Sequence, residues 1–151
     1  MALKETEGSL RAYLIFAGAV SILLGLRDTS DLKDLEGVAL PLDWTLAVYV
    51  PLISDFVLGA AFIAAGIRLK AELPRGAGWI KTMLVASGVM LFINGALIVS
   101  VFGTEIGRSG IGHALIGLAI TIYLHRSVVR LAKEAAARDG IPPPPPTAKV
   151  V

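Results

Sequence analysis

Long runs of apolar residues, separated by short polar stretches, occupy almost the whole chain. An α-helix rises about 1.5 Å per residue, so crossing a hydrocarbon layer of about 30 Å takes about 20 residues. Inside that layer every backbone N–H and C=O group must find its partner within the protein, and a helix provides this. The pattern therefore predicts an all-α polytopic membrane protein, with four transmembrane helices in an antiparallel bundle at about residues 11–26, 46–67, 79–102 and 111–131.

Composition supports a single transmembrane domain at residues 1–140, followed by a proline-rich cytoplasmic tail at residues 141–151. Of the 151 residues, 55% are hydrophobic, and the mean hydropathy is +0.74. A soluble protein would have to surround four helices that are apolar on all sides, and a chain of this length cannot supply that layer. The consecutive prolines at 142–146 predict a polyproline II spacer or, alternatively, a ligand for a proline-reading domain.

The distribution of basic residues predicts the orientation, because Lys and Arg accumulate on cytoplasmic segments. With four helices, both termini and the second loop share one side of the membrane. That side carries eleven basic residues: Lys4, Arg11, Arg68, Lys70, Arg75, Lys81, Arg126, Arg130, Lys133, Arg138 and Lys149. The opposite side carries three: Arg27, Lys33 and Arg108. We therefore expect a multi-pass protein of the cell membrane with both termini cytoplasmic, whose partner is the lipid bilayer and not nucleic acid.

Two polar stretches are expected to be loops. The first, at residues 27–45, is external, and residues 30–37 within it predict one or two helical turns with an acidic face. Such a segment is typical of an interfacial helix, and a docking surface or a cation-collecting mouth is the alternative. The second loop, at residues 68–78, is expected to turn at Pro74 and Gly76.

Every predicted helix or its edge carries two glycines seven residues apart. The pairs are Gly18 and Gly25, Gly59 and Gly66, Gly88 and Gly95, and Gly110 and Gly117. Seven residues make two helical turns, so each pair lies on one face of its helix. Helices in lipid associate through close van der Waals contact, which small residues allow. We expect close packing at these faces, either within one chain or across a symmetric interface.

A layer of polar residues is predicted at depth in the membrane. Asp55 is the only acidic residue inside a predicted helix, and it lies about 14 Å from the start of that helix, near the bilayer midplane. Asn94, Ser21 and Thr121 fall at comparable depths on the other three helices. If these faces point inward, the four side chains form a polar cluster in the outer half of the bundle.

Three interpretations of Asp55 are open. A neutral Asp55 could form a structural clasp with Asn94 or with a backbone carbonyl. If its helix begins at Pro51, Asp55 instead lies near the positive end of the helix dipole, in a shallow position. The third interpretation is a site for a proton, a cation or a partner, because an ionisable group at depth is costly.

The sequence shows no arrangement of residues typical of a catalytic site, and no cofactor is predicted. His113 and His125 both fall on the fourth predicted helix, near opposite membrane faces, whereas haem in a bundle usually takes histidines from facing helices. Structural zinc lacks ligands. The chain has no cysteine, which excludes disulfides and iron–sulfur clusters held by its own thiolates. Haem or a quinone stays open as an alternative.

Several motifs in the first two-thirds of the chain follow one family pattern. They are Arg11, Gly25-Leu26-Arg27, Asp55, Gly59 and Gly66-Ile67-Arg68. In these features the chain resembles the DoxX-type four-span membrane proteins, with Asp55 where that family often has Glu. The family's glycine-rich Ser-Leu-Asp stretch is missing, and Tyr123-Leu124-His125-Arg126 stands instead. The resemblance implies an accessory membrane subunit tied to quinone-linked or redox-stress complexes.

Two functional hypotheses follow from the sequence. The first is an accessory or structural subunit that packs through its glycine faces into a homo-oligomer or a larger membrane complex. The alternative is a small proton or cation transporter or channel that uses Asp55. A membrane-bound redox enzyme would additionally need a bound cofactor.

Overall fold

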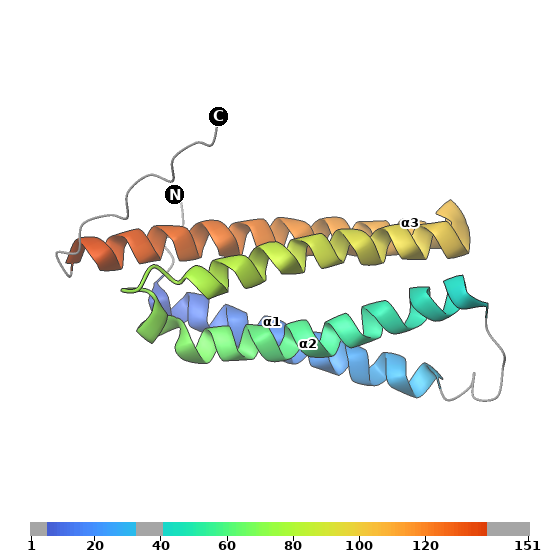
Figure 1. Cartoon of the computed structure of the whole chain (residues 1–151), viewed down its shortest axis with the longest axis horizontal. Helices are drawn as coiled ribbons and strands as arrows, with labels where there is room; N and C mark the ends of the chain where they lie inside the picture. The colour runs from blue at the N-terminus through green and yellow to red at the C-terminus, as the bar shows by residue number, and fades with distance from the viewer. Residues whose placement is uncertain (1–5, 33–40, 139–151) are drawn as a thin grey trace.

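The computed structural model describes residues 6–32 and 41–138, except for the side chains of residues 31–32, 104–111 and 113. Helix α1 covers Glu7–Leu32, α2 covers Leu42–Glu72 and α3 covers Gly78–Arg138. Helix α3 consists of two helical segments that meet at Gly103, where φ is 72° and ψ is 176°. This left-handed φ favours glycine, because other residues would clash through Cβ. The two segments of α3 therefore run antiparallel to each other (Figure 1).

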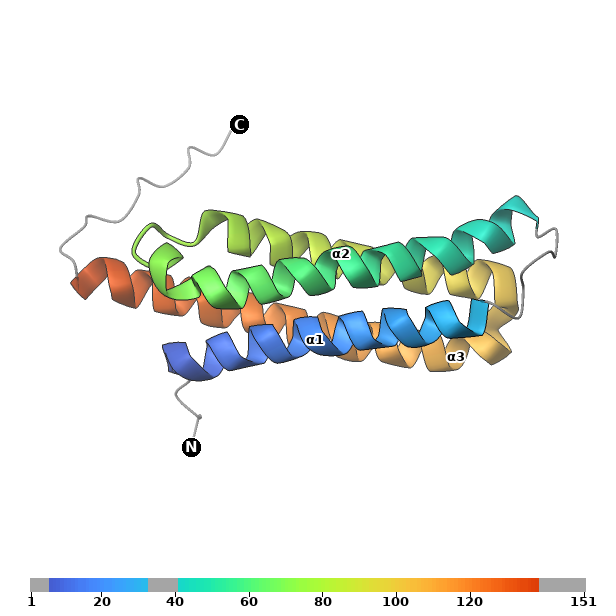
Figure 2. The same ribbon diagram turned by 90° about the horizontal axis from the view of Figure 1, so that it is seen from below.

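The predicted all-α architecture with four transmembrane helices is confirmed. Within residues 6–32 and 41–138, four helical segments are long and apolar enough to cross a membrane: Glu7–Ser30, Leu42–Glu72, Gly78–Gly103 and Ala114–Arg138. Successive segments run antiparallel along a common axis, and the start of α1 and the end of α3 lie at the same end of the bundle (Figures 1 and 2).

The helices extend beyond the apolar runs that predicted them. Helix α1 begins at Glu7 because Thr6 and Ser9 cap it reciprocally: the Thr6 N–H donates to Ser9 Oγ (3.0 Å), and the Ser9 N–H donates to Thr6 Oγ1 (3.3 Å). The loop predicted at residues 27–45 was wrong at both of its ends, which are helical up to Leu32 and from Leu42 onward. An apolar run marks the hydrocarbon thickness, and a helix continues into polar residues outside it.

Between the third and fourth apolar runs the chain is helical on both sides of Gly103. Three further predictions concern two loops and the tail. The helical turns predicted at residues 30–37 lie mostly outside the described residues, as does the proline-rich tail. The turn predicted at Pro74 and Gly76 is confirmed, since α2 ends at Glu72 and Gly76 has a φ of 83°.

This turn is a Schellman motif, which satisfies backbone carbonyls at the end of α2. The Ala77 N–H donates to the Glu72 carbonyl (2.9 Å), and the Gly76 N–H donates to the Leu73 carbonyl (3.0 Å). The chain then reverses within five residues, from Leu73 to Ala77, before α3 begins. The turn thus places the end of α2 beside the start of α3.

The apolar core lies at the end of the bundle that contains this turn. All four transmembrane segments contribute to it. Its largest fully buried side chains are Leu10, Leu14, Leu69, Ile80, Leu84 and Val128. At the opposite end the side chain of Trp44, near the start of α2, packs edge-on against Phe102, with ring centroids 5.0 Å apart. The two hairpins are therefore joined mainly at the predicted cytoplasmic side.

The glycine faces pack helices of the same chain against each other. A methyl group added at Gly18 of α1 would lie 2.5 Å from the carbonyl oxygen of Gly59 on α2. Gly25 faces the ring of Phe56, and Gly66 faces Ile15. These contacts hold α1 and α2 backbone to backbone, the close approach that small residues allow in lipid.

Glycines also line the contact between the two segments of α3. An added Cβ would lie 3.4 Å from Leu118 at Gly88, 3.4 Å from Ala114 at Gly95 and 3.1 Å from Leu91 at Gly117. The surroundings of Gly110 lie outside the described residues. Seven of the eight predicted glycines therefore face another helix of their own chain.

Candidate functional site

Ser21 and Asp55 link α1 to α2. The Ser21 hydroxyl donates a hydrogen bond to the backbone carbonyl of Asp55 at 3.0 Å, and its Oγ lies 3.5 Å from the Asp55 carboxylate oxygen Oδ1. Asp55 lies thirteen residues after the first residue of α2, or about 20 Å along the helix. Because α2 begins at Leu42 and Pro51 lies inside it, the helix does not begin at Pro51, as the shallow interpretation of Asp55 required.

A second polar link joins α2 to the third transmembrane segment. The Asn94 amide nitrogen Nδ2 donates to the hydroxyl of Ser54 at 2.8 Å, and this hydroxyl donates to the Pro51 carbonyl at 2.7 Å. Ser54 is only 6% exposed. The oxygen of the same amide, Asn94 Oδ1, is buried and has no hydrogen-bond partner among the described residues.

The predicted clasp between Asp55 and Asn94 therefore has a different form. Successive residues on an α-helix are rotated by about 100°, so Ser54 and Asp55 point toward different neighbours. Ser54 bonds Asn94, whereas Asp55 accepts from Ser21. Depth along the membrane axis is readable from sequence, but the direction in which each residue points is not. Sequence reasoning missed Ser54, and its only signal is a small polar residue beside Asp55 on an apolar helix.

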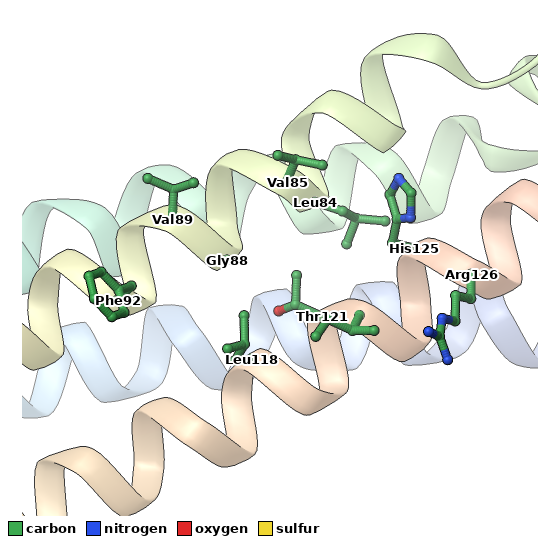
Figure 3. Close-up of a pocket in the computed structure, with 10 residues that line it drawn as sticks. Leu84, Val85, Gly88, Val89, Phe92, Leu118, Thr121, His125 and Arg126 are labelled. Atoms are coloured by element: carbon green, nitrogen blue, oxygen red, sulfur yellow. The ribbon is translucent and has the colours of Figure 1, made fainter.

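Thr121 does not belong to these links. Its hydroxyl donates to the Gly117 carbonyl of its own helix at 2.8 Å. Thr121 instead lines a groove of about 420 Å³ between the two segments of α3, with His125 and Arg126 at one end (Figure 3). The predicted four-residue cluster thus divides into the pair Ser21–Asp55, the pair Asn94–Ser54 and an unconnected Thr121.

The described residues hold no group of three or more His, Asp or Glu side chains that could bind a metal ion. His125 lies in the groove, whereas the side chain of His113 lies outside the described residues. The two polar links have the chemistry of helix–helix hydrogen bonds, which in membrane proteins contribute about 0.6 kcal/mol on average and up to about 1.7 kcal/mol. They tie α2 to both of its neighbours.

Comparisons with protein-family models, with curated proteins and with solved structures give no match to this chain.

A double-mutant cycle tests the link between Asn94 and Ser54. Asn94→Ala, Ser54→Ala and the double variant should show a coupling free energy of about 0.6–1.7 kcal/mol, because each single change removes the same hydrogen bond. The measurement is unfolding of the protein in mixed micelles with a denaturing detergent. The matched cycle of Asn94→Ala with Thr121→Ala should show none, since Thr121 bonds within its own helix. Equal coupling in both cycles would contradict the assignment.

Proposed function

We propose that this protein is an integral membrane accessory or structural subunit that assembles with copies of itself or with a larger membrane complex. The main observation behind the proposal is that four polar residues of the membrane-spanning segments are engaged in contacts between helices. Ser21, Asp55, Ser54 and Asn94 all form hydrogen bonds between helices. The described glycines of the predicted faces also contact other helices of the chain. Such a set of contacts supports a scaffold.

The outer surface supports association with other membrane segments. In the most apolar 18-residue stretch of each transmembrane segment, between 17% and 28% of the residues are buried within the chain. Large apolar side chains are exposed on every segment, among them Phe16, Val57, Phe92 and Ile116. These faces contact lipid or another membrane protein. The DoxX resemblance implies that such a partner would be part of a redox complex. Because the glycine faces are occupied, the interface would use these larger side chains.

Cysteine crosslinking tests this proposal, and the absence of native cysteine makes each substitution unique. The variants are Phe16→Cys, Val57→Cys, Phe92→Cys and Ile116→Cys, one on each segment and each 62–74% exposed. After oxidation in native membranes, at least one variant should give a disulfide-linked dimer, or a heavier adduct with another protein after treatment with a thiol-reactive crosslinker. Ala65→Cys, whose position is 0% exposed, should give neither.

A different result would overturn the subunit proposal. If all four variants remain uncrosslinked in native membranes, and native mass spectrometry of the unmodified protein gives the mass of a single chain, the protein acts alone. Such a result would favour the alternative function.

The alternative function is transport of protons or cations through Asp55. It is favoured by one observation: among the described residues, the only side chain that hydrogen-bonds the half-buried carboxyl group of Asp55 is Ser21, whose hydroxyl lies at 3.5 Å. A carboxyl group at this depth with so weak a partner is suited to exchange a proton or bind a cation.

Flux measurements in proteoliposomes test the alternative. If Asp55 is the transport site, the unmodified protein should conduct protons or monovalent cations, Asp55→Asn should abolish the flux, and Ser21→Ala should leave it largely intact. Unchanged flux in Asp55→Asn, or no flux in the unmodified protein, would reject this function.

A further inference from the structure

The groove between the two segments of α3 has one apolar wall from each segment. Its residues on the third transmembrane segment are Leu84, Val85, Gly88, Val89 and Phe92. Those on the fourth are Leu118, Thr121, Ile122, His125 and Arg126. Since the Thr121 hydroxyl is bonded to the Gly117 carbonyl, the groove away from His125 and Arg126 presents mainly hydrocarbon. Figure 3 shows His125 and Arg126 at one end of the groove and Phe92 at the other.

The polar end lies near the predicted cytoplasmic surface. The segments are antiparallel, so His125 and Arg126 lie beside Leu84 and Val85, six and seven residues after the first residue of α3. This places them about 9–10 Å along the helix from that end. Arg126 is exposed. Among the described residues no hydrogen bond or ion pair engages its guanidinium or the imidazole of His125.

An exposed arginine at this depth requires an anionic partner or a path to the headgroup layer. A long arginine side chain places its charge at the headgroup level while its stem covers apolar surface. Basic pockets between transmembrane helices on the cytoplasmic side bind anionic lipid headgroups. In this groove the cation lies at the end nearest the headgroups, and the apolar walls extend from it toward the membrane centre.

The length, volume and charge of the groove fit the acyl chain of an anionic lipid. From Leu84 to Phe92 the groove follows eight residues, or about 12 Å, and its volume is about 420 Å³. A narrow apolar groove with a cation at the end nearest the headgroups is complementary to an amphiphile that has one anionic end.

We propose that this groove binds an anionic glycerophospholipid, with one acyl chain between the two segments of α3 and its phosphate bound by Arg126 at the polar end. The guanidinium offers charge-assisted hydrogen bonds to the phosphate oxygens, whereas His125 points toward the third transmembrane segment and lines the groove (Figure 3). The site would select lipids by headgroup charge, since the apolar walls accept any acyl chain.

Lipid titration followed by native mass spectrometry tests this site on the full chain in detergent. The probes are phosphatidylglycerol and phosphatidylcholine with identical acyl chains. Phosphatidylglycerol should bind more tightly, and Arg126→Gln should weaken its binding about fivefold, the effect of one basic residue near an anionic lipid. Arg126→Lys should retain most of the binding. Arg68→Gln, which removes an exposed charge from the same side but outside the groove, should change it less than twofold.

A second pair of variants tests the apolar walls without changing charge. Val89→Trp should fill the groove and weaken binding of both lipids, whereas Val57→Trp, at a similarly exposed position on α2, should not. Glycerol phosphate, which has the anionic group but no acyl chains, should not displace the lipid. Circular dichroism and thermal unfolding identify any variant that fails to fold.

Four results would overturn the proposal. They are equal binding of the two lipids, equal losses in Arg126→Gln and Arg68→Gln, full binding by a folded Val89→Trp, and displacement by glycerol phosphate. The last would assign the site to a soluble phosphate instead. If Arg126→Gln does not fold, Val89→Trp and the comparison of the two lipids still decide the outcome.

Discussion

The close approach of the α1 and α2 backbones at Gly18 and Gly59 is the contact on which the first half of the structure depends. Ser21 lies three residues after Gly18, and Asp55 lies four residues before Gly59, so each shares a helix face with its glycine. Because the helices are antiparallel, the glycine contact also brings Ser21 to Asp55. A larger residue at either glycine would separate the helices and with them the polar pair.

Helix α2 is the element that connects this hairpin to the rest of the bundle. One face of α2 contacts α1 through Gly59 and Asp55, and Ser54 reaches Asn94 on the neighbouring segment. Near its end, Leu69 joins the core beside the Leu73–Ala77 turn. In lipid, hydrophobic burial contributes little to the free energy of helix association. Close van der Waals contact and a few hydrogen bonds are therefore the interactions that specify this arrangement.

The fold could be predicted from sequence to a greater extent than the site. Hydrophobic runs identified four helices because their length must match the bilayer, but they did not locate helix ends such as Glu7, which the Thr6–Ser9 cap determines. The glycine spacing identified the packing faces. The sequence placed Ser21 and Asn94 in one layer with Asp55 but could not tell which of them bonds it, because depth follows from residue number whereas direction depends on how each helix is rotated. The Schellman turn was readable from Pro74 and Gly76.

The central claim is that the glycine faces pack within one chain. Magic-angle-spinning NMR of glycine-labelled protein in lipid bilayers tests it directly, through the cross-peak between the Gly18 Cα and the Gly59 carbonyl. Labelled chains are then diluted with an excess of unlabelled chains. If the contact is intramolecular, the cross-peak intensity per labelled chain stays unchanged on dilution. A cross-peak that is absent, or that disappears as labelled chains are diluted, would contradict the account.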